Sequence, residues 1–332
     1  MMRLLRAELG RFRSRSLVWV VTIVTLAIAG FVVANAYVTS RPPSDAEVAQ
    51  QQKFFDENFA MWETEHEVWY QDCLAGEAIE REASGDPTLD WDCEANLAPP
   101  VFGDWIYRSM FSDQATSNLS GYLQLLLGGA FLIGASLLAA EAATGNLGLW
   151  LTFEPRRSRV LASKLTAVAL GSLAYCAIGA AVLLAGTTAA TALNDALDAT
   201  PELWRSLTLM TARGVALGVV AGALGGAFGA LLRHTAAALG VLFGYLVVVE
   251  VLVRNLVPTL QPWLVLPNLT AVLHGTYTVY WEKCPASPET GQLDCTRIER
   301  TLTLLPASIL LSVLTAAVLA VTWLVFRRRD VS

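Results

Sequence analysis

Side chains that commonly carry catalysis are few in this chain of 332 residues. Its three histidines are His66, His234 and His274. We place His66 and His274 on one side of a membrane and His234 on the other, so they cannot form a catalytic triad or a multi-histidine metal centre. The Gly-x-Ser-x-Gly motif of serine hydrolases is also absent. These observations argue against a hydrolytic active site.

The lysines exclude ATP hydrolysis by a P-loop. A P-loop needs a lysine that follows glycine and precedes serine or threonine. The chain has only Lys53, Lys164 and Lys283, and none of them follows a glycine. We therefore expect that the chain is not an enzyme and carries no cofactor of its own.

Four of the five cysteines fall in two segments that we place outside the cell membrane, where disulfides persist. Cys73 and Cys93 lie in the first segment, and Cys284 and Cys295 lie in the last. Four cysteines allow three connectivities. We prefer Cys73 with Cys93 and Cys284 with Cys295, because these separations are short.

The composition indicates a membrane protein. Hydrophobic residues make up 54% of the chain and charged residues only 16%, unlike the average soluble domain. Because about 20 apolar residues of helix cross the hydrocarbon core, we predict an all-α polytopic integral membrane protein. Its six transmembrane helices are expected at residues 17–38, 120–140, 165–192, 209–232, 235–256 and 301–326.

The charges predict the orientation. Residues 1–16, 141–164, Arg233 and 327–332 hold 13 basic and 4 acidic residues, whereas residues 39–119, 194–206 and 254–300 hold 9 basic and 24 acidic residues. By the positive-inside rule both termini face the cytoplasm. A cleaved signal peptide is the alternative for the first span, but its apolar run of 22 residues exceeds the usual length of about 7–15.

The connecting segments follow from this topology. On the cytoplasmic side we expect an interfacial helix at 1–16, where five arginines surround apolar residues at helical spacing, a loop at 141–164 and a tail at 327–332. On the extracellular side we expect a cap at 39–119, a short loop at 193–208, and a re-entrant region with a loop at 257–300. Three prolines, Pro258, Pro262 and Pro267, make the last segment unsuited to a straight crossing.

The extracellular segment 39–119 has a helical pattern of its own. Residues 44–74 contain neither glycine nor proline, and their apolar residues recur at helical spacing. We expect Ser44 or Asp45 to cap this helix and a disulfide to hold a returning segment against it, giving a small folded cap. Glu63, His66 and Glu67 share one face of the helix, which leaves a divalent-metal site as an alternative, although no second histidine or cysteine stands at ligand spacing.

Two patterns lie inside the predicted spans. Glycines recur every four residues, which permits close packing of membrane helices, and we favour packing within one subunit over a dimer seam; they are Gly214, Gly218, Gly222 and Gly226. Three ionisable residues, Arg213, Glu250 and Arg254, are costly in a bilayer unless paired. We expect a structural ion pair between helices, with an outer gate or substrate path as the alternative.

The loop 141–164 carries the most specific pattern. Glu141 is followed by Gly145 and Leu147, then by Pro155 with Arg156 and Arg157, and Lys164 opens the next span. This order resembles the type-2 permeases of ATP-binding-cassette (ABC) transporters. The arginine-rich start and the six spans extend the resemblance over most of the membrane part, whereas the acidic, cysteine-bearing cap is longer than is usual in that family.

The resemblance implies a permease subunit of a bacterial ABC exporter in the plasma membrane. It implies that a separate cytoplasmic ATPase, in two copies and with its own ATP and Mg²⁺, grips this loop and the interfacial helix. A second permease, identical or paralogous, and membrane lipids complete the expected partners, and no nucleic acid is expected. The alternative is a ligand-sensing or scaffolding subunit that signals through the cap without transport.

The same loop can act as a coupling element on physical grounds. A short helix would present Leu147 and Leu149 for burial, and Pro155 would end it. Basic side chains would then meet lipid phosphates or acidic residues of the partner. The candidate coupling residues are Glu141, Gly145, Leu147, Leu149, Glu154, Pro155, Arg156, Arg157, Arg159 and Lys164; a basic loop that merely fixes topology is the alternative.

Overall fold

The computed structural model describes residues 2–143, 156–284 and 295–328. Six helical segments of this part are long and apolar enough to cross a membrane. They are α2 (Ser16–Thr39), α5 (Phe111–Ala143), α7 (Arg157–Ala192), α8 (Pro201–Leu232), the continuous segment α9–η2–α10 (Thr235–Leu256) and α12 (Leu304–Arg328). The predicted all-α polytopic membrane fold is thereby confirmed.

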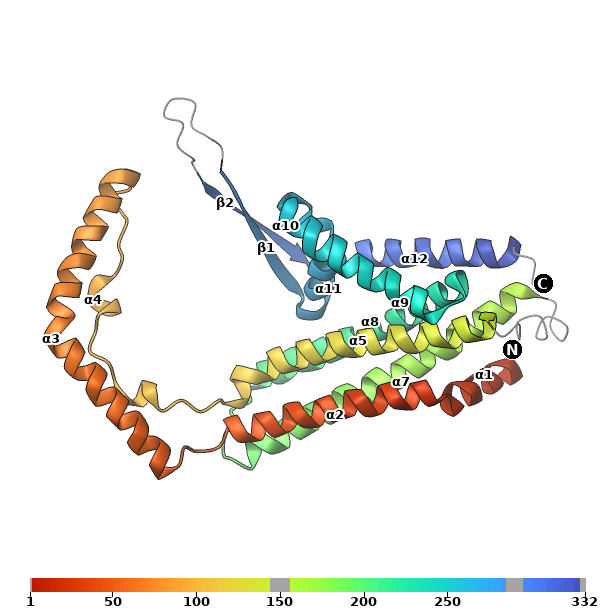
Figure 1. Ribbon diagram of the computed structural model, residues 1–332, viewed down its shortest axis with the longest axis horizontal. Coiled ribbons are helices and arrows are strands. Elements are labelled where there is room, and N and C mark those ends of the chain that lie inside the picture. The colour runs from red at the N-terminus through yellow and green to blue at the C-terminus, as the bar shows by residue number, and fades with distance from the viewer. Residues whose placement is uncertain (1, 144–155, 285–294, 329–332) are drawn as a thin grey trace.

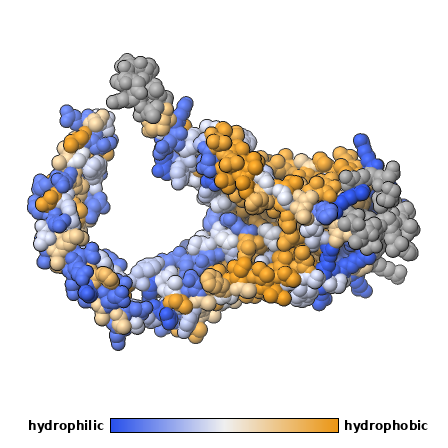
Figure 2. Space-filling view, in the orientation of Figure 1, coloured by the Kyte–Doolittle hydropathy of each residue, from blue (hydrophilic) through white to orange (hydrophobic). Residues whose placement is uncertain are grey.

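The six segments alternate in direction along an elongated bundle (Figure 1). Helix α1 (Met2–Ser14), the start of α7 and the end of α12 lie at one end, which we call the terminal end. Helix α3 (Asp45–Ser84) and the strands β1 (Thr276–Lys283) and β2 (Thr296–Thr303) extend from the opposite end, which we call the cap end. Hydrophobic surface covers the bundle, and hydrophilic surface covers the cap (Figure 2).

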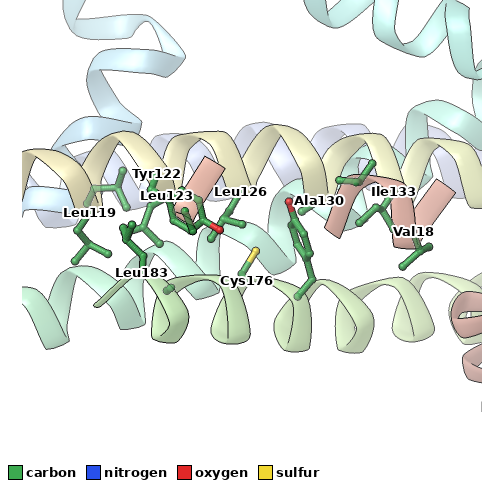
Figure 3. Close-up of a cluster of buried hydrophobic side chains, with 14 of the residues drawn as sticks. Val18, Leu119, Tyr122, Leu123, Leu126, Ala130, Ile133, Cys176 and Leu183 are labelled. Carbon is green, nitrogen blue, oxygen red and sulfur yellow. The ribbon is translucent and has the colours of Figure 1, made fainter. Parts of the chain in front are cut away.

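Helix α5 lies at the centre of the bundle and packs against α2, α7 and α8. Its fully buried face includes Leu119, Leu123, Leu126 and Ile133, which meet side chains of α7 such as Cys176 (Figure 3). By contrast, α9 and α12 expose most of their apolar side chains. Lipid is the surrounding that such apolar, outward-facing helices require.

The glycine stripe of α8 is buried within the subunit. A side chain at Gly214 would meet Leu123 of α5, and one at Gly218 would meet Cys176 of α7. Gly226 lies beside both of these neighbouring helices, and the carbonyl of Gly222 lies against Gly134. The absence of side chains therefore lets the α8 backbone approach α5 and α7, as favoured from the sequence.

The cap is an arm built on one long helix. Ser44 accepts a hydrogen bond from the Glu47 backbone N–H, and the Glu47 carboxylate accepts one from the Ser44 N–H, which closes a capping box. Gly85, with φ of 65°, ends the helix. The returning chain carries α4 (Cys93–Asn96) and η1 (Phe102–Trp105) and runs back along α3 to α5 (Figure 1).

The segment 257–300 differs from a simple re-entrant hairpin. A 3-10 turn, η3 (Pro258–Trp263), and the short helix α11 (Val265–His274) occupy the proline-rich part. Strands β1 and β2 then pair antiparallel, with Thr276 opposite Thr303 and Lys283 opposite Thr296. We did not predict this ribbon, although the run from Thr276 to Trp281 consists of β-branched and aromatic residues, which favour strands.

Candidate functional site: a buried ion cluster at the terminal end

Four charged side chains meet at the terminal end. The Lys164 Nζ lies 2.9 Å from Glu8 Oε1 and also donates to the Glu141 carboxylate. Arg11 Nη1 lies 3.4 Å from Glu141 Oε1 and 3.7 Å from Glu8 Oε1. We call these residues, Glu8, Arg11, Glu141 and Lys164, the ion cluster. Two carboxylates and two cations give it a formal charge of zero.

Three members of the cluster are largely buried, whereas Arg11 lies at its edge with 43% of its side chain exposed. The Lys164 side chain is 4% exposed, and those of Glu8 and Glu141 are 6% and 16% exposed. Removing such groups from water is costly, and only close opposite charges offset the cost. The pairing therefore fixes the relative positions of the three helices that supply the charges, because separation would leave a buried charge without a partner.

The amphipathic pattern of α1 explains how it reaches this site. Its Phe12 is buried against Gly171 of α7, where any side chain would collide with the ring. One turn earlier on the same helix, Glu8 projects to Lys164. A single face of α1 thus places an apolar anchor and a carboxylate against α7.

A further arginine ties the junction of α1 and α2 to α5. Arg15, at the junction of α1 and α2, donates to the backbone carbonyl of Ser136 in α5. Burial lowers the pKa of Arg15 from its ordinary value, and the nearby Glu141 carboxylate opposes that shift. The guanidinium keeps its charge in proteins and adds to the positive character of this end.

The ion cluster brings together two of the predicted coupling residues, Glu141 at the end of α5 and Lys164 in α7. Residues 144–155 connect these helices covalently. Of the remaining coupling candidates, Arg156 is the exposed N-cap residue of α7, and Arg157 and Arg159 lie in its first turn. Gly145, Leu147, Leu149, Glu154 and Pro155 lie outside the described residues.

Glu8 and Arg11 were not predicted as site residues. The available signal was Glu8 itself, the only acidic residue among the five arginines of residues 1–16. A single carboxylate in a basic amphipathic helix can indicate an ion pair with a cation inside the protein. Its partner could not be predicted, because α1 and Lys164 are far apart in the sequence.

The expected ion pair inside the spans is not formed by the described residues, which corrects that expectation. Glu250 is 3% exposed and accepts hydrogen bonds from the Tyr245 hydroxyl at 2.7 Å and the Leu266 backbone N–H at 2.9 Å. Arg213 donates instead to the Leu273 carbonyl at 3.4 Å. The polar groups of α11 and Tyr245 thus take the place that we assigned to Arg213 and Arg254.

A local change of helix type accompanies Glu250. Residues Tyr245–Val253 form the π-helix η2 between α9 (Thr235–Gly244) and α10 (Arg254–Leu256). π-Helical turns are uncommon and occur frequently at functional sites. The wider turn brings the Tyr245 hydroxyl, five residues earlier, to Glu250.

At the cap end the structure joins Cys73 to Cys93 and Cys284 to Cys295, the pairing preferred from the sequence. The first bond holds α4 against α3, and the second lies at the tip of the β-ribbon. Cys176 is buried in α7.

The metal alternative on α3 gains no support. His66 stacks on Trp62 with ring centroids 4.2 Å apart, and its Nδ1 lies 2.9 Å from the Trp62 carbonyl. In the part of the chain that the structure describes, no group of three or more His, Cys, Asp or Glu side chains could hold a metal ion.

Six membrane-crossing helices and a buried ion cluster at one basic end define a polytopic α-helical membrane protein with a rigid attachment point for the segment between α5 and α7. Comparison with known families agrees with this class. The sequence model of the ABC-2 family transporter proteins matches residues 2–331, nearly the whole chain. The chain belongs to this family and is a transmembrane subunit of an ABC transporter. Searches of curated proteins and of solved structures gave no match.

Proposed function

We propose that the chain is the permease of an ATP-driven exporter in a bacterial plasma membrane, and that it moves a hydrophobic or amphipathic solute such as a drug, lipid, peptide or glycan. Both termini then face the cytoplasm, where the basic segments meet two copies of a separate ABC ATPase that binds ATP and Mg²⁺. A second permease, identical or paralogous, completes the complex. Export is the direction that predominates among the transporters this chain resembles.

The ion cluster is the observation that carries the proposal. It binds α1, α5 and α7 together next to Arg156 and the residues that resemble a coupling loop. Force applied by a partner to the segment 144–155 would therefore reach two transmembrane helices and the interfacial helix together. Such a linkage suits a subunit that receives mechanical work from elsewhere.

The proposal is tested by reversing charge at the start of α7. The double variant Arg156→Glu and Arg157→Glu should insert in the membrane at normal abundance but fail to retain the ATPase on co-purification. The matched control is Arg297→Glu with Arg300→Glu on the exposed strand β2 at the cap end, which should retain it. Normal retention of the ATPase by the first variant would contradict the proposal.

A second candidate function is ligand sensing without transport. The arm-like cap favours it, because α3 extends away from the bundle and packs mainly on its own returning segment (Figures 1 and 2). Deleting residues 44–96 distinguishes the two. Retained substrate-stimulated ATPase activity and efflux would favour the exporter, whereas loss of the ligand response in an intact complex would favour the sensor.

A further inference from the structure

A pocket of about 600 Å³ lies at the base of the cap, in the described part of the chain. Its walls come from the end of α2, the start of α3, the segment around η1 and the start of α5. Figure 1 shows that the linker into α3 and the linker into α5 converge at this corner of the molecule. The volume falls within the range of about 300–1,000 Å³ that is usual for small-molecule sites.

The lining of this cap-base pocket is rich in neutral polar side chains. Four carboxamides line it, one from α2, one from α3 and two from α5, together with one aromatic ring at the end of η1 and one just after it. They are Asn35, Gln51, Gln114, Asn118, Trp105 and Tyr107.

The charged residues of the lining give the pocket little net charge. Arg41 and Glu47 both line the pocket and offset each other. Hydrogen bonds from the Ser44 backbone and hydroxyl lower the pKa of Glu47 and commit its carboxylate to the cap of α3. A strongly charged ligand would therefore find no dedicated counter-ion pair here.

Much of the hydrogen-bonding capacity of the carboxamides is unused. Gln114 Nε2 is buried and has no hydrogen-bond partner among the described residues. Its Oε1 accepts only a long bond of 3.5 Å from Asn118. The side chains of Asn35 and Gln51 are exposed at the pocket, so their amides are accessible to a ligand. A buried donor without a partner is unfavourable, so a polar ligand group that reached Gln114 would supply the missing hydrogen bond.

This chemistry selects a ligand type. A carboxamide donates and accepts hydrogen bonds at once, and so does a hydroxyl group. The negative faces of aromatic rings accept the weakly positive C–H faces of a sugar ring. We propose that the cap-base pocket binds a neutral, hydroxyl-rich group, that is, a sugar or the sugar part of a larger molecule. This inference goes beyond the proposed export function and stands whether or not an ATPase docks at the terminal end.

The test measures binding to the full-length protein in lipid nanodiscs free of sugar-based detergent. Isothermal titration with maltotriose should give saturable binding, and N-acetyl-trialanine amide, a neutral peptide probe, should give none. Gln114→Leu removes the carboxamide that we expect to bond to the sugar. It should weaken maltotriose binding about tenfold, which corresponds to a loss of about 1.4 kcal/mol. Gln51→Leu, at an exposed position of α3, should weaken binding in the same direction without disturbing the bundle.

Gln71→Leu is the matched control. Its amide donates to Glu67 on the exposed side of α3, outside the pocket lining, so binding should be unchanged. The proposal is overturned if maltotriose shows no saturable binding, if the peptide binds in its place, or if Gln51→Leu binds as tightly as the unmodified chain. Because no ATPase is present, failure of the coupling proposal leaves this result unaffected.

Discussion

Lys164 is the central cation of the ion cluster at the terminal end. It is buried among apolar side chains of α5 and α7 and touches carboxylates from two other helices, Glu8 and Glu141. A lysine in such surroundings is tolerated only when it is paired. The partners are equally dependent on it, because Arg11, the other cation of the cluster, is 43% exposed and lies farther from both.

Replacing Lys164 with methionine should therefore destabilise the fold. The substitution keeps most of the side-chain volume but leaves two buried carboxylates with a weaker counter-charge. Breaking a buried pair in this way costs about 3–5 kcal/mol. The purified full-length protein should lose its monodisperse elution peak at a clearly lower temperature than the unmodified protein.

Two companion variants make this test specific. Adding Glu8→Gln to Lys164→Met removes one of the two carboxylates that lost their closest cation, so part of the lost stability should return. Lys53→Met removes an exposed pair with Glu57 at 4.0 Å on α3 and should have little effect. If the double variant were less stable than Lys164→Met alone, mutual compensation within the cluster would be wrong.

At the scale of elements, close packing between α5 and α8 holds the bundle together. At one crossing Gly134 faces the backbone of Gly222, and at the next Gly225 faces the carbonyl of Phe131. No side chain on either helix separates the two backbones there. This contact positions α5, and α5 in turn carries Glu141 to the ion cluster.

Adding a single methyl group on α5 tests this packing. Gly134→Ala places a Cβ against the Gly222 carbonyl and 2.9 Å from the Gly226 nitrogen, so the two helices must separate. We expect a lower melting temperature and reduced folded yield. Gly121→Ala on the same helix meets nothing within 4 Å and should be neutral or slightly stabilising, because alanine favours a helix by about 1 kcal/mol. Equal effects of the two variants would contradict this account of the α5–α8 contact.

The helices and the β-ribbon show which features of the fold could be predicted from the sequence. The period of the α8 glycines predicted a close helix contact, and length and hydropathy predicted all six spans. A sequence pattern does not say which distant segment a helix face will meet. Neither the α5–α8 crossing nor the Glu8–Lys164 pair could therefore be derived. The β-ribbon was missed for a different reason: the prolines before it suggested a broken membrane hairpin, and the strand preference of Thr276 to Trp281 was overlooked.

From their charges alone, we expected the ionisable residues of the spans to form an ion pair. Glu250 and Arg254 stand one helical turn apart, and Arg213 was placed at a similar level on the preceding span, so we expected an ion pair between the two helices. The π-helix at Tyr245–Val253 alters that spacing, and a tyrosine hydroxyl and a backbone N–H satisfy one oxygen of Glu250 instead. Neither the π-helix nor the approach of α11 has a signature that we could read beforehand.

At the scale of the whole molecule, the two ends are chemically distinct. The terminal end combines basic side chains with the ion cluster, and the cap end carries the acidic arm, both disulfides and the cap-base pocket. A belt of apolar surface lies between them (Figure 2). The chain belongs to the ABC-2 transporter family, and we propose that a separate ATPase docks at the terminal end.

Photo-crosslinking in living cells tests this docking. A benzoylphenylalanine placed at Ser158, an exposed position in the first turn of α7, should crosslink to a protein that contains a P-loop, identified by mass spectrometry. The same probe at Tyr107, which is 73% exposed at the cap end, should not. Crosslinks to the ATPase from position 107 and none from position 158 would show that the energy input lies at the other end of the molecule.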